Sequence, residues 1–254
     1  MNSPESIIPL LSGDTEEMTG RKSTPEEIRR RFDQDVERFS NLETGQSATV
    51  DAPLALDLIA RAAAAVNPEA ASVLDIGCGA GNYTLKLMQH LPVRSVSLVD
   101  LSRPMLDRAV DRIRAAGCTS VEAMHGDIRE VAVPEERFDI VVAAAVLHHL
   151  REEDEWTAVF TAVHRALRQG GSFWIFDLVA HEPPALQQLM WHRYGEYLSG
   201  FKGPAYRDQV FAYVEAEDTP RPLAWQMDLL ARTGFRRVEV LHKSVCFAAF
   251  GGLK

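Results

Sequence analysis

Three glycines and one carboxylate are the residues of this chain whose type and spacing point most clearly to chemistry. The segment VLDIGCGAGN, residues 73 to 82, runs from an apolar stretch into Gly77, Gly79 and Gly81. A strand that ends in such a turn leaves the backbone free of side chains, so a ligand can lie against it. Asp100 ends the next apolar run, where a carboxylate can accept both hydroxyls of a ribose. The spacing predicts a nucleotide-type site for an unphosphorylated ribose.

Two residues beside the glycines narrow the choice of ligand. A dinucleotide-binding loop needs a glycine where this chain has Asn82, and Asp75 stands two places before Gly77. A carboxylate at that place would repel a pyrophosphate and attract a cation. S-adenosylmethionine carries an ammonium and a sulfonium and no phosphate. The loop therefore favours S-adenosylmethionine over a dinucleotide.

Three further segments follow the glycine loop in order. They read GDI at 126 to 128, FDIVVAAAVLHHL at 138 to 150 and LRQGGSFWIFD at 167 to 177. With these segments the chain resembles the class I S-adenosylmethionine-dependent methyltransferases, over roughly residues 70 to 180. The resemblance implies that S-adenosylmethionine is the methyl donor and S-adenosylhomocysteine the product.

The resemblance also assigns roles at the carboxyl ends of the strands, where open α/β sheets bind ligands. Asp75 and the glycine backbone would hold the methionine amino group, Asp100 the ribose and Asp127 the adenine amino group. Leu101 and Ile128 would contact the adenine ring. The residues expected to bind the cofactor are Asp75, Gly77, Gly79, Asn82, Asp100, Leu101, Asp127, Ile128 and Ala143.

Catalytic groups are less evident, because methyl transfer from a sulfonium depends mainly on alignment and needs a base only when the acceptor loses a proton. His148 and His149 follow the strand at 138 to 144, and Asp177 stands at the tip of the next strand. Each is a candidate to deprotonate or orient the acceptor. The alternative for either histidine is a cap or a packing contact beneath the next helix. Backbone groups at Ala143 or Ala144 would lie near the methionine portion.

Two segments outside these motifs are expected to cover the site. The segment 23 to 66 holds helices, and one at 26 to 39 starts with a capping box at Thr24 and can place Phe32 and Phe39 over the cofactor, or pack them on the domain. The insertion at 179 to 221 has weak periodicity and one expected helix near 184 to 198. Its candidates for the lining of an acceptor pocket are His181, Trp191, His192, Tyr194, Tyr197, Tyr206 and Arg207.

The elements between these segments alternate. Apolar strands and helices follow each other from residue 73 to 178, which predicts a parallel sheet covered on both faces. The runs FRRVEVLHKS and VCFAAFG near the end read as an antiparallel pair. We therefore predict an α/β, Rossmann-like, doubly wound sheet of seven strands, mostly parallel with an antiparallel C-terminal strand.

Composition excludes several other classes of protein. The 254 residues are 46% hydrophobic and carry a net charge of -9, which argues against an extended nucleic-acid surface. We predict one domain at 23 to 254 after a flexible stretch at 1 to 22, no membrane span and a cytoplasmic location. The cysteines Cys78, Cys118 and Cys246 lack metal-ligand spacing, and no metal is expected. The acidic surface and aromatic insertion suggest a small-molecule acceptor.

A second, narrower resemblance leaves an alternative open. The segments GDIREVAV, LMWHRY at 189 to 194 and LLARTGF at 229 to 235 are similar to carboxy-S-adenosylmethionine synthases of tRNA wobble-uridine modification. That resemblance suggests kinship and a homodimer more than shared chemistry, and it leaves carboxyl transfer open as the alternative to methyl transfer. The loop GCGAGN and the segment LHHL depart from those synthases. A binding protein without turnover is the third hypothesis.

Overall fold

The computed structural model describes residues 21–41 and 47–254. The flexible stretch expected at residues 1 to 22 lies almost wholly outside the described residues. Lys22, at its end, contacts the body of the protein, because its Nζ donates hydrogen bonds to the backbone carbonyls of Glu215 and Asp218.

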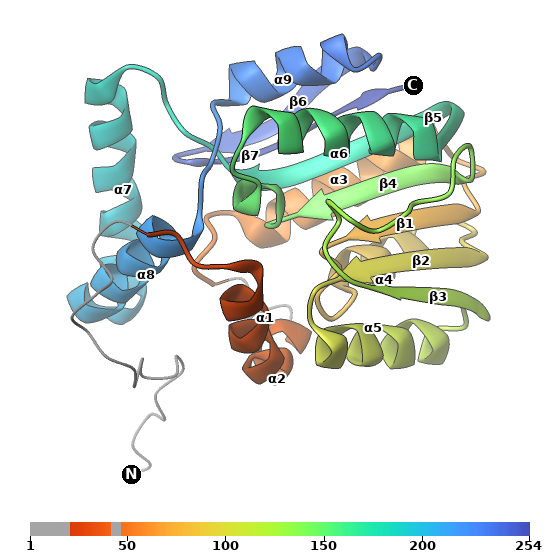
Figure 1. The fold of residues 1–254 in the computed structure, drawn as a ribbon, viewed down its shortest axis with the longest axis horizontal. Coiled ribbons are helices and arrows are strands. Elements are labelled where there is room, and N and C mark those ends of the chain that lie inside the picture. Colours follow the sequence, from red (N-terminus) through yellow and green to blue (C-terminus); the bar gives the residue numbers. More distant parts are fainter. Residues whose placement is uncertain (1–20, 42–46) are drawn as a thin grey trace.

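Within the described residues, seven strands form one sheet in the order β3-β2-β1-β4-β5-β7-β6 (Figure 1). The first five strands pair in parallel, and β7 runs antiparallel to both β5 and β6. The bounds are β1 (Ser72–Ile76), β2 (Ser95–Asp100), β3 (Ser120–His125), β4 (Phe138–Ala144), β5 (Leu167–Leu178), β6 (Arg236–Ser244) and β7 (Phe247–Leu253). The Rossmann-like fold expected from the sequence is confirmed.

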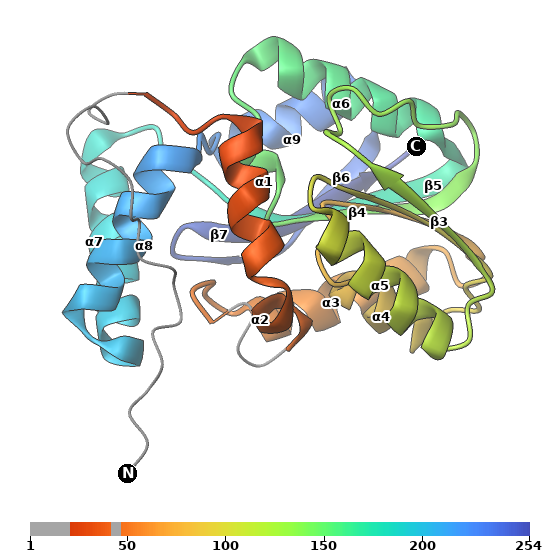
Figure 2. The ribbon, with the colours of Figure 1, turned by 60° about the horizontal axis from the view of Figure 1, so that its bottom comes forward.

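Helices cover both faces of this sheet (Figure 2). One face carries α3 (Ala52–Val66), α4 (Asn82–Met88) and α5 (Arg103–Ala115), and the other carries α6 (Glu153–Ala166) and α9 (Leu223–Arg232). All five residues of β1 are buried, which accounts for its unbroken apolar run. The strand order reverses between β1 and β4, so the ligand crevice is expected at the carboxyl ends of these two strands.

The N-terminal segment forms two short helices where the sequence predicted one. The capping box at Thr24 is confirmed, because the Glu27 N–H donates to Thr24 Oγ1 and the Glu27 carboxylate accepts from the Thr24 N–H. Asp35 then interrupts the helix, since its N–H bonds to the Phe32 carbonyl and closes the last turn. The two helices are α1 (Pro25–Gln34) and α2 (Val36–Ser40).

The insertion after β5 is a helical hairpin. The helix expected near 184 to 198 is present as α7 (Pro184–Lys202), and Gly203, at a positive φ of 89°, turns the chain into α8 (Pro204–Glu217). The sequence analysis missed α8. Its inward face mixes tyrosines and a glutamine with valines, because it borders a cavity as well as the apolar core. In both ribbon views α1 lies between this hairpin and the sheet domain.

Candidate active site

A cavity of about 290 Å³ lies at the carboxyl ends of β1, β2 and β4. The glycine loop after β1 and the residues that end β2 form its floor. Its walls come from α1, α2 and the α7–α8 hairpin, so the two segments expected to cover the site do border it. Most of its lining is apolar, as expected for a pocket that takes a small molecule and excludes water.

Asp75 is the acidic residue beneath this cavity. Only 2% of its surface is exposed, and Thr84 Oγ1 donates to its Oδ2 at 2.7 Å. Burial raises the pKa of Asp75 to about 7, and the hydrogen bond from Thr84 offsets only part of that effect. A cation bound beside this carboxylate would favour its ionised form. The structure thus has a carboxylate at the cavity, and its contact with a methionine ammonium stays a prediction.

The glycine loop needs its glycines for two different reasons. Gly77 and Gly79 both have positive φ, at 63° and 49°. A Cβ at Gly77 would lie 2.5 Å from the Val146 side chain, whereas a Cβ at Gly79 would meet no described atom within 4 Å. Gly77 is thus required by packing. Gly79 leaves open space that a ligand can use.

Asp100, at the end of β2, faces the same loop. Its Oδ2 accepts the Gly79 N–H and its Oδ1 accepts the Ser102 N–H, each at 2.8 Å. Burial raises the pKa of Asp100 to about 6, although both backbone hydrogen bonds act in the opposite direction. Each carboxylate oxygen has a second lone pair. Asp100 is therefore held rigidly with acceptor capacity left for two ribose hydroxyls.

The residues expected around the adenine also line the cavity. Leu101, Asp127 and Ile128 border it, on the loops after β2 and β3. The Arg129 guanidinium donates to both oxygens of Asp127 and is shared with Glu155. Burial alone would raise the pKa of Asp127, but the hydrogen bonds from Arg129 outweigh it and lower that pKa. Asp127 thus stays ionised as an acceptor.

Asn82 lines the cavity, yet both ends of its amide are engaged within the protein. Its Nδ2 donates to the Phe39 carbonyl at 2.9 Å, and its Oδ1 accepts from Arg112. The helix pair α1–α2 is held a second time where Ser102 Oγ donates to Asp33 at 2.7 Å. Asn82 fastens the N-terminal helices over the loop, in addition to any contact with a ligand.

Ala143 requires a correction. It was expected at the cofactor, but only 1% of its surface is exposed and it packs in the core beneath α6. The chain reaches the cavity one residue later, through Ala144, Ala145 and Val146. Ala145 has a positive φ of 52°, which turns the backbone after β4 toward the site. Strand β4 continues through Ala144, so Ala143 still lies inside the strand and does not border the cavity.

The three catalytic candidates lie together but have different surroundings. Asp177 is 1% exposed and sits beneath the cavity, where its carboxylate accepts the N–H groups of Leu147 and His148 and the Nδ1–H of the His148 ring. With these partners it is a positioning residue, so the expected direct contact with an acceptor is corrected. Burial alone would lower the pKa of His148, but Asp218 and Asp177 outweigh it and raise that pKa to about 9.

His149 lies on the cavity wall beside the N-terminal helix. Its ring is 6.1 Å from the ring of Phe32, which packs in turn on Phe39 at 5.6 Å. Burial, the neighbouring His148 and Arg31 hold the pKa of His149 well below its usual value. The ring is therefore neutral at neutral pH.

The structure divides the residues expected in the acceptor pocket. Tyr194 and Tyr206 line the cavity. Trp191 stacks on Phe211 at 4.7 Å inside the hairpin, and His192 is 72% exposed beside Glu196. The other members lie elsewhere: Tyr197 bonds the Ser47 carbonyl, Arg207 pairs with exposed Asp208, and His181 borders a smaller pocket with Lys243.

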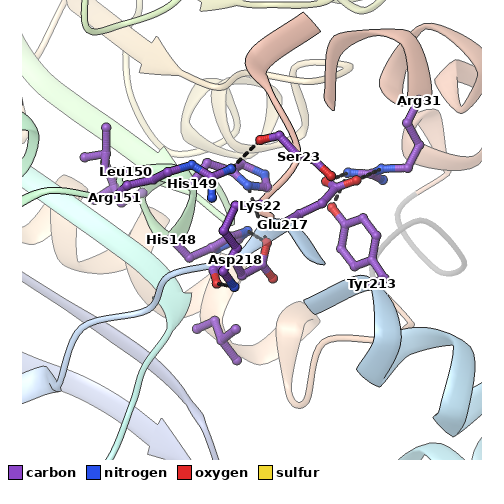
Figure 3. A network of polar contacts seen from close by, with 12 residues as sticks. Lys22, Ser23, Arg31, His148, His149, Leu150, Arg151, Tyr213, Glu217 and Asp218 are labelled. Carbon is purple, nitrogen blue, oxygen red and sulfur yellow. Dashed lines mark hydrogen bonds and ion pairs between the residues drawn. The ribbon is translucent and has the colours of Figure 1, made fainter. Parts of the chain in front are cut away.

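A polar network on the cavity wall was missed by the sequence analysis (Figure 3). Arg31 pairs with Glu217 at 2.8 Å and lies 4.0 Å from the ring of Tyr213. Asp218 follows Glu217 and faces the two histidines. These residues come from α1 and the end of α8, and α8 was not anticipated. The one available signal was an acidic pair next to a tyrosine-rich stretch.

Comparisons with known proteins bear on this site. A protein family described as a methyltransferase domain matches residues 73–171, which hold the glycine loop, Asp100, Asp127 and both histidines. Residues 73–171 are thus similar to a methyltransferase domain.

Two curated relatives are named as methyltransferases. An uncharacterized methyltransferase of Mycobacterium tuberculosis is 34% identical over 120 residues, 47% of this chain and 55% of that protein. The chain thus spans about half the length of that relative. A demethylmenaquinone methyltransferase of Listeria monocytogenes is 23% identical over 177 residues, 68% of this chain and 73% of that protein.

Solved structures share the fold of this chain. A putative O-methyltransferase of Nostoc punctiforme has a TM-score of 0.62 at 17% identity, covering 88% of this chain and 60% of that one. A phosphoethanolamine N-methyltransferase of Haemonchus contortus, in complex with phosphomonomethylethanolamine and S-adenosylhomocysteine, has a TM-score of 0.54 at 22% identity, covering 74% and 38%.

In the described part of the chain, no helix is long and apolar enough to cross a membrane.

Proposed function

We propose that this protein transfers the methyl group of S-adenosylmethionine to a small-molecule acceptor and releases S-adenosylhomocysteine. The observation that carries the proposal is the contact between Asp100 and the Gly79 N–H, at 2.8 Å. It joins a ribose acceptor to a loop whose glycine opens into a cavity. A ligand with an adenosine and a short cationic chain fits both parts at once.

The charges of the cavity floor support a cationic ligand. Asp75 is buried and Asp100 is half-buried, and this burial raises the pKa of each, so ionising them without a partner is costly. The ammonium of S-adenosylmethionine would relieve this cost at Asp75. The ribose hydroxyls would do so at Asp100 by donating hydrogen bonds. A pyrophosphate at the same place would add to the repulsion.

Methyl transfer requires alignment and the exclusion of water more than it requires a strong base. Bound S-adenosylmethionine supplies an activated methyl group on a sulfonium. The chain would align it through the glycine loop and cover it with α1 and α2, which Asn82 and Ser102 fasten to the rim. The site thus provides what an in-line displacement needs from the protein.

The upper part of the cavity would receive the acceptor. Tyr194, Tyr206 and Tyr213 line it together with Phe247, and Lys202 brings a positive charge. Such walls suit a small, partly apolar molecule. Arg31 and Glu217 neutralise each other beside it.

Mass spectrometry of the small molecules that co-purify with the protein tests the proposal. We expect S-adenosylmethionine or S-adenosylhomocysteine at up to one equivalent. An adduct heavier by a carboxyl group would support the carboxyl-transfer alternative and contradict methyl transfer. A dinucleotide would overturn the assignment of the loop. Loss of the ligand in Asp100→Ala, but not in a variant of exposed Asp107, would tie it to this site.

A further inference from the structure

Two neighbouring histidines and one aspartate converge on the cavity wall (Figure 3). His148 and His149 form the end of the short helix η1 (Leu147–His149) after β4, and Asp218 is the residue that ends α8. One ligand atom from each lies within 4.8 Å of the other two. The Asp218 Oδ1 is 3.6 Å from His148 Nε2 and 3.4 Å from His149 Nδ1. Segments far apart in the sequence thus bring three donors together.

Two of these three residues, His149 and Asp218, have side-chain atoms without a hydrogen-bond partner. Both ring nitrogens of His149 and the Oδ1 of Asp218 are buried without a hydrogen bond among residues 21–41 and 47–254. The Asp218 side chain is only 3% exposed. A buried polar atom without a partner is destabilising, so such atoms normally mark a bound water, ion or ligand. His149 Nδ1 and Asp218 Oδ1 lie 3.4 Å apart, so one occupant can contact both of these residues.

We propose that His148, His149 and Asp218 bind one divalent transition-metal ion, and that Zn²⁺ is the ion they suit best. Imidazole and carboxylate are the nitrogen and oxygen ligands that zinc uses in proteins. Three protein ligands with a further position open are the arrangement of catalytic zinc sites. All three residues border the cavity, so the open coordination position faces the space assigned to the acceptor.

The contact beneath His148 supports this assignment. A carboxylate can only accept, so the bond between His148 Nδ1 and Asp177 places the ring proton on Nδ1. The other nitrogen, Nε2, is then the one turned toward Asp218 and the cluster. Histidines that bind metals commonly donate their second N–H to a carboxylate in this way, which fixes the ring and raises its basicity. A proton and a metal ion would compete for Nε2.

Basic residues nearby do not block a cation, because each has an acidic or carbonyl partner. Arg31 pairs with Glu217, Lys22 donates to two backbone carbonyls, and Arg151 donates to the Ser23 carbonyl (Figure 3). Asp177, Glu217 and Asp218 balance these three positive charges. A divalent ion with neutral histidines would leave a net positive site. The net positive charge would therefore favour an anion as the fourth ligand of the metal ion.

The metal site also suggests a class of acceptor, an inference that rests on the proposed function. A thiol or hydroxyl bound to zinc loses its proton to solvent and stays as a zinc-bound anion. Its lone pair would form the new bond to the methyl carbon. The carbon–sulfur bond of the sulfonium would break, and its electrons would remain on the sulfur of S-adenosylhomocysteine. No further oxidant or reductant is required.

Metal binding can be measured without any acceptor. Untagged full-length protein, stripped with a chelator and dialysed, would be titrated with Zn²⁺ by competition against a chromophoric chelator. We expect one equivalent to bind, and His149→Ala and Asp218→Asn to weaken the affinity at least 100-fold. His192→Ala, which removes an exposed histidine of α7, is the matched control and should bind like the wild type. Binding of Zn²⁺ by His149→Ala at wild-type affinity would overturn the proposal.

Three further measurements distinguish loss of the metal site from misfolding. S-adenosylhomocysteine should still bind His149→Ala, and Asp177→Asn should weaken Zn²⁺ binding by about 10- to 100-fold while it keeps the three ligands. Substitution with Co²⁺ should give the visible spectrum of a nitrogen and oxygen site in the wild type alone. Failure of Zn²⁺ to bind with normal cofactor affinity would remove the metal site only. Zinc binding without cofactor binding would remove the proposed function only.

Discussion

The Nδ1–H of His148 donates to the Oδ1 of Asp177, and this bond joins the loop after β4 to the end of β5. It orients the ring so that Nε2 points to Asp218, 3.6 Å away on α8. A sheet residue thereby positions a side chain at the contact between the sheet domain and the α7–α8 hairpin. Of the hydrogen-bonded pair, His148 borders the cavity and Asp177 lies beneath it.

The two glycines of the loop should respond differently to a side chain. In Gly79→Val the new side chain would enter open cavity space, so we expect a folded protein that no longer binds S-adenosylhomocysteine. In Gly77→Val it would collide with Val146, so we expect a loss of stability instead. Thermal unfolding and calorimetry on both variants check this contrast. Normal cofactor affinity in Gly79→Val would show that the loop does not bind the ligand.

The buried Asp75 should make stability depend on pH. Its pKa is about 7 in the folded protein and near 3.8 otherwise, so the folded state holds the extra proton between these values. Its favourable contribution is therefore complete below about pH 4 and is lost as the pH rises through 7, on the order of 2 to 4 kcal/mol. Asp75→Asn should flatten that decline and be more stable than the wild type at pH 8.

Denaturant unfolding from pH 5 to pH 8 measures this effect, with Asp107→Asn as a control at an exposed site. The same substitution should weaken S-adenosylmethionine binding, because it removes the charge opposite the ammonium. A variant that is less stable than the wild type at pH 8 would mean that burial does not raise the pKa of Asp75 in the free protein.

The helices α1 and α2 should become more protected when the cofactor binds. They are joined to the rim by the bonds from Asn82 to Phe39 and from Ser102 to Asp33, and they contain the phenylalanines of the cavity wall. Hydrogen exchange with and without S-adenosylhomocysteine should show slower exchange at residues 25 to 40. Residues of α6, on the far side of the sheet, serve as the internal control. Equal changes in both would indicate general stabilisation and no lid.

Trp191 should matter for stability and not for the cofactor. It is partly buried and stacks on Phe211 inside the α7–α8 hairpin. We expect Trp191→Ala to lower the free energy of unfolding by roughly 2 to 3 kcal/mol, less than for a fully buried aromatic residue. Its affinity for S-adenosylhomocysteine should match that of the wild type. A weaker affinity without loss of stability would move Trp191 into the ligand site.

The sequence was most informative where one physical constraint decides the outcome. The buried strands, the capping box at Thr24 and the rim position of Asp75 and Asp100 follow from local patterns, and the structure has them in place. It was least informative for α8, whose inward face is mixed because it borders a cavity. Asp218 was missed for the same reason. Its contact with His149 exists only through the packing of the hairpin, which no short-range pattern encodes.

Calorimetry of S-adenosylhomocysteine binding to the wild type and to Asp100→Ala tests the central claim most directly. The claim is that Asp100 and the glycine loop form an adenosine site. We predict one binding site in the wild type, a loss of about 1 to 3 kcal/mol in Asp100→Ala as its charged hydrogen bonds disappear, and no loss in Asp107→Ala. An unchanged dissociation constant in folded Asp100→Ala, or no binding to the wild type, would contradict it.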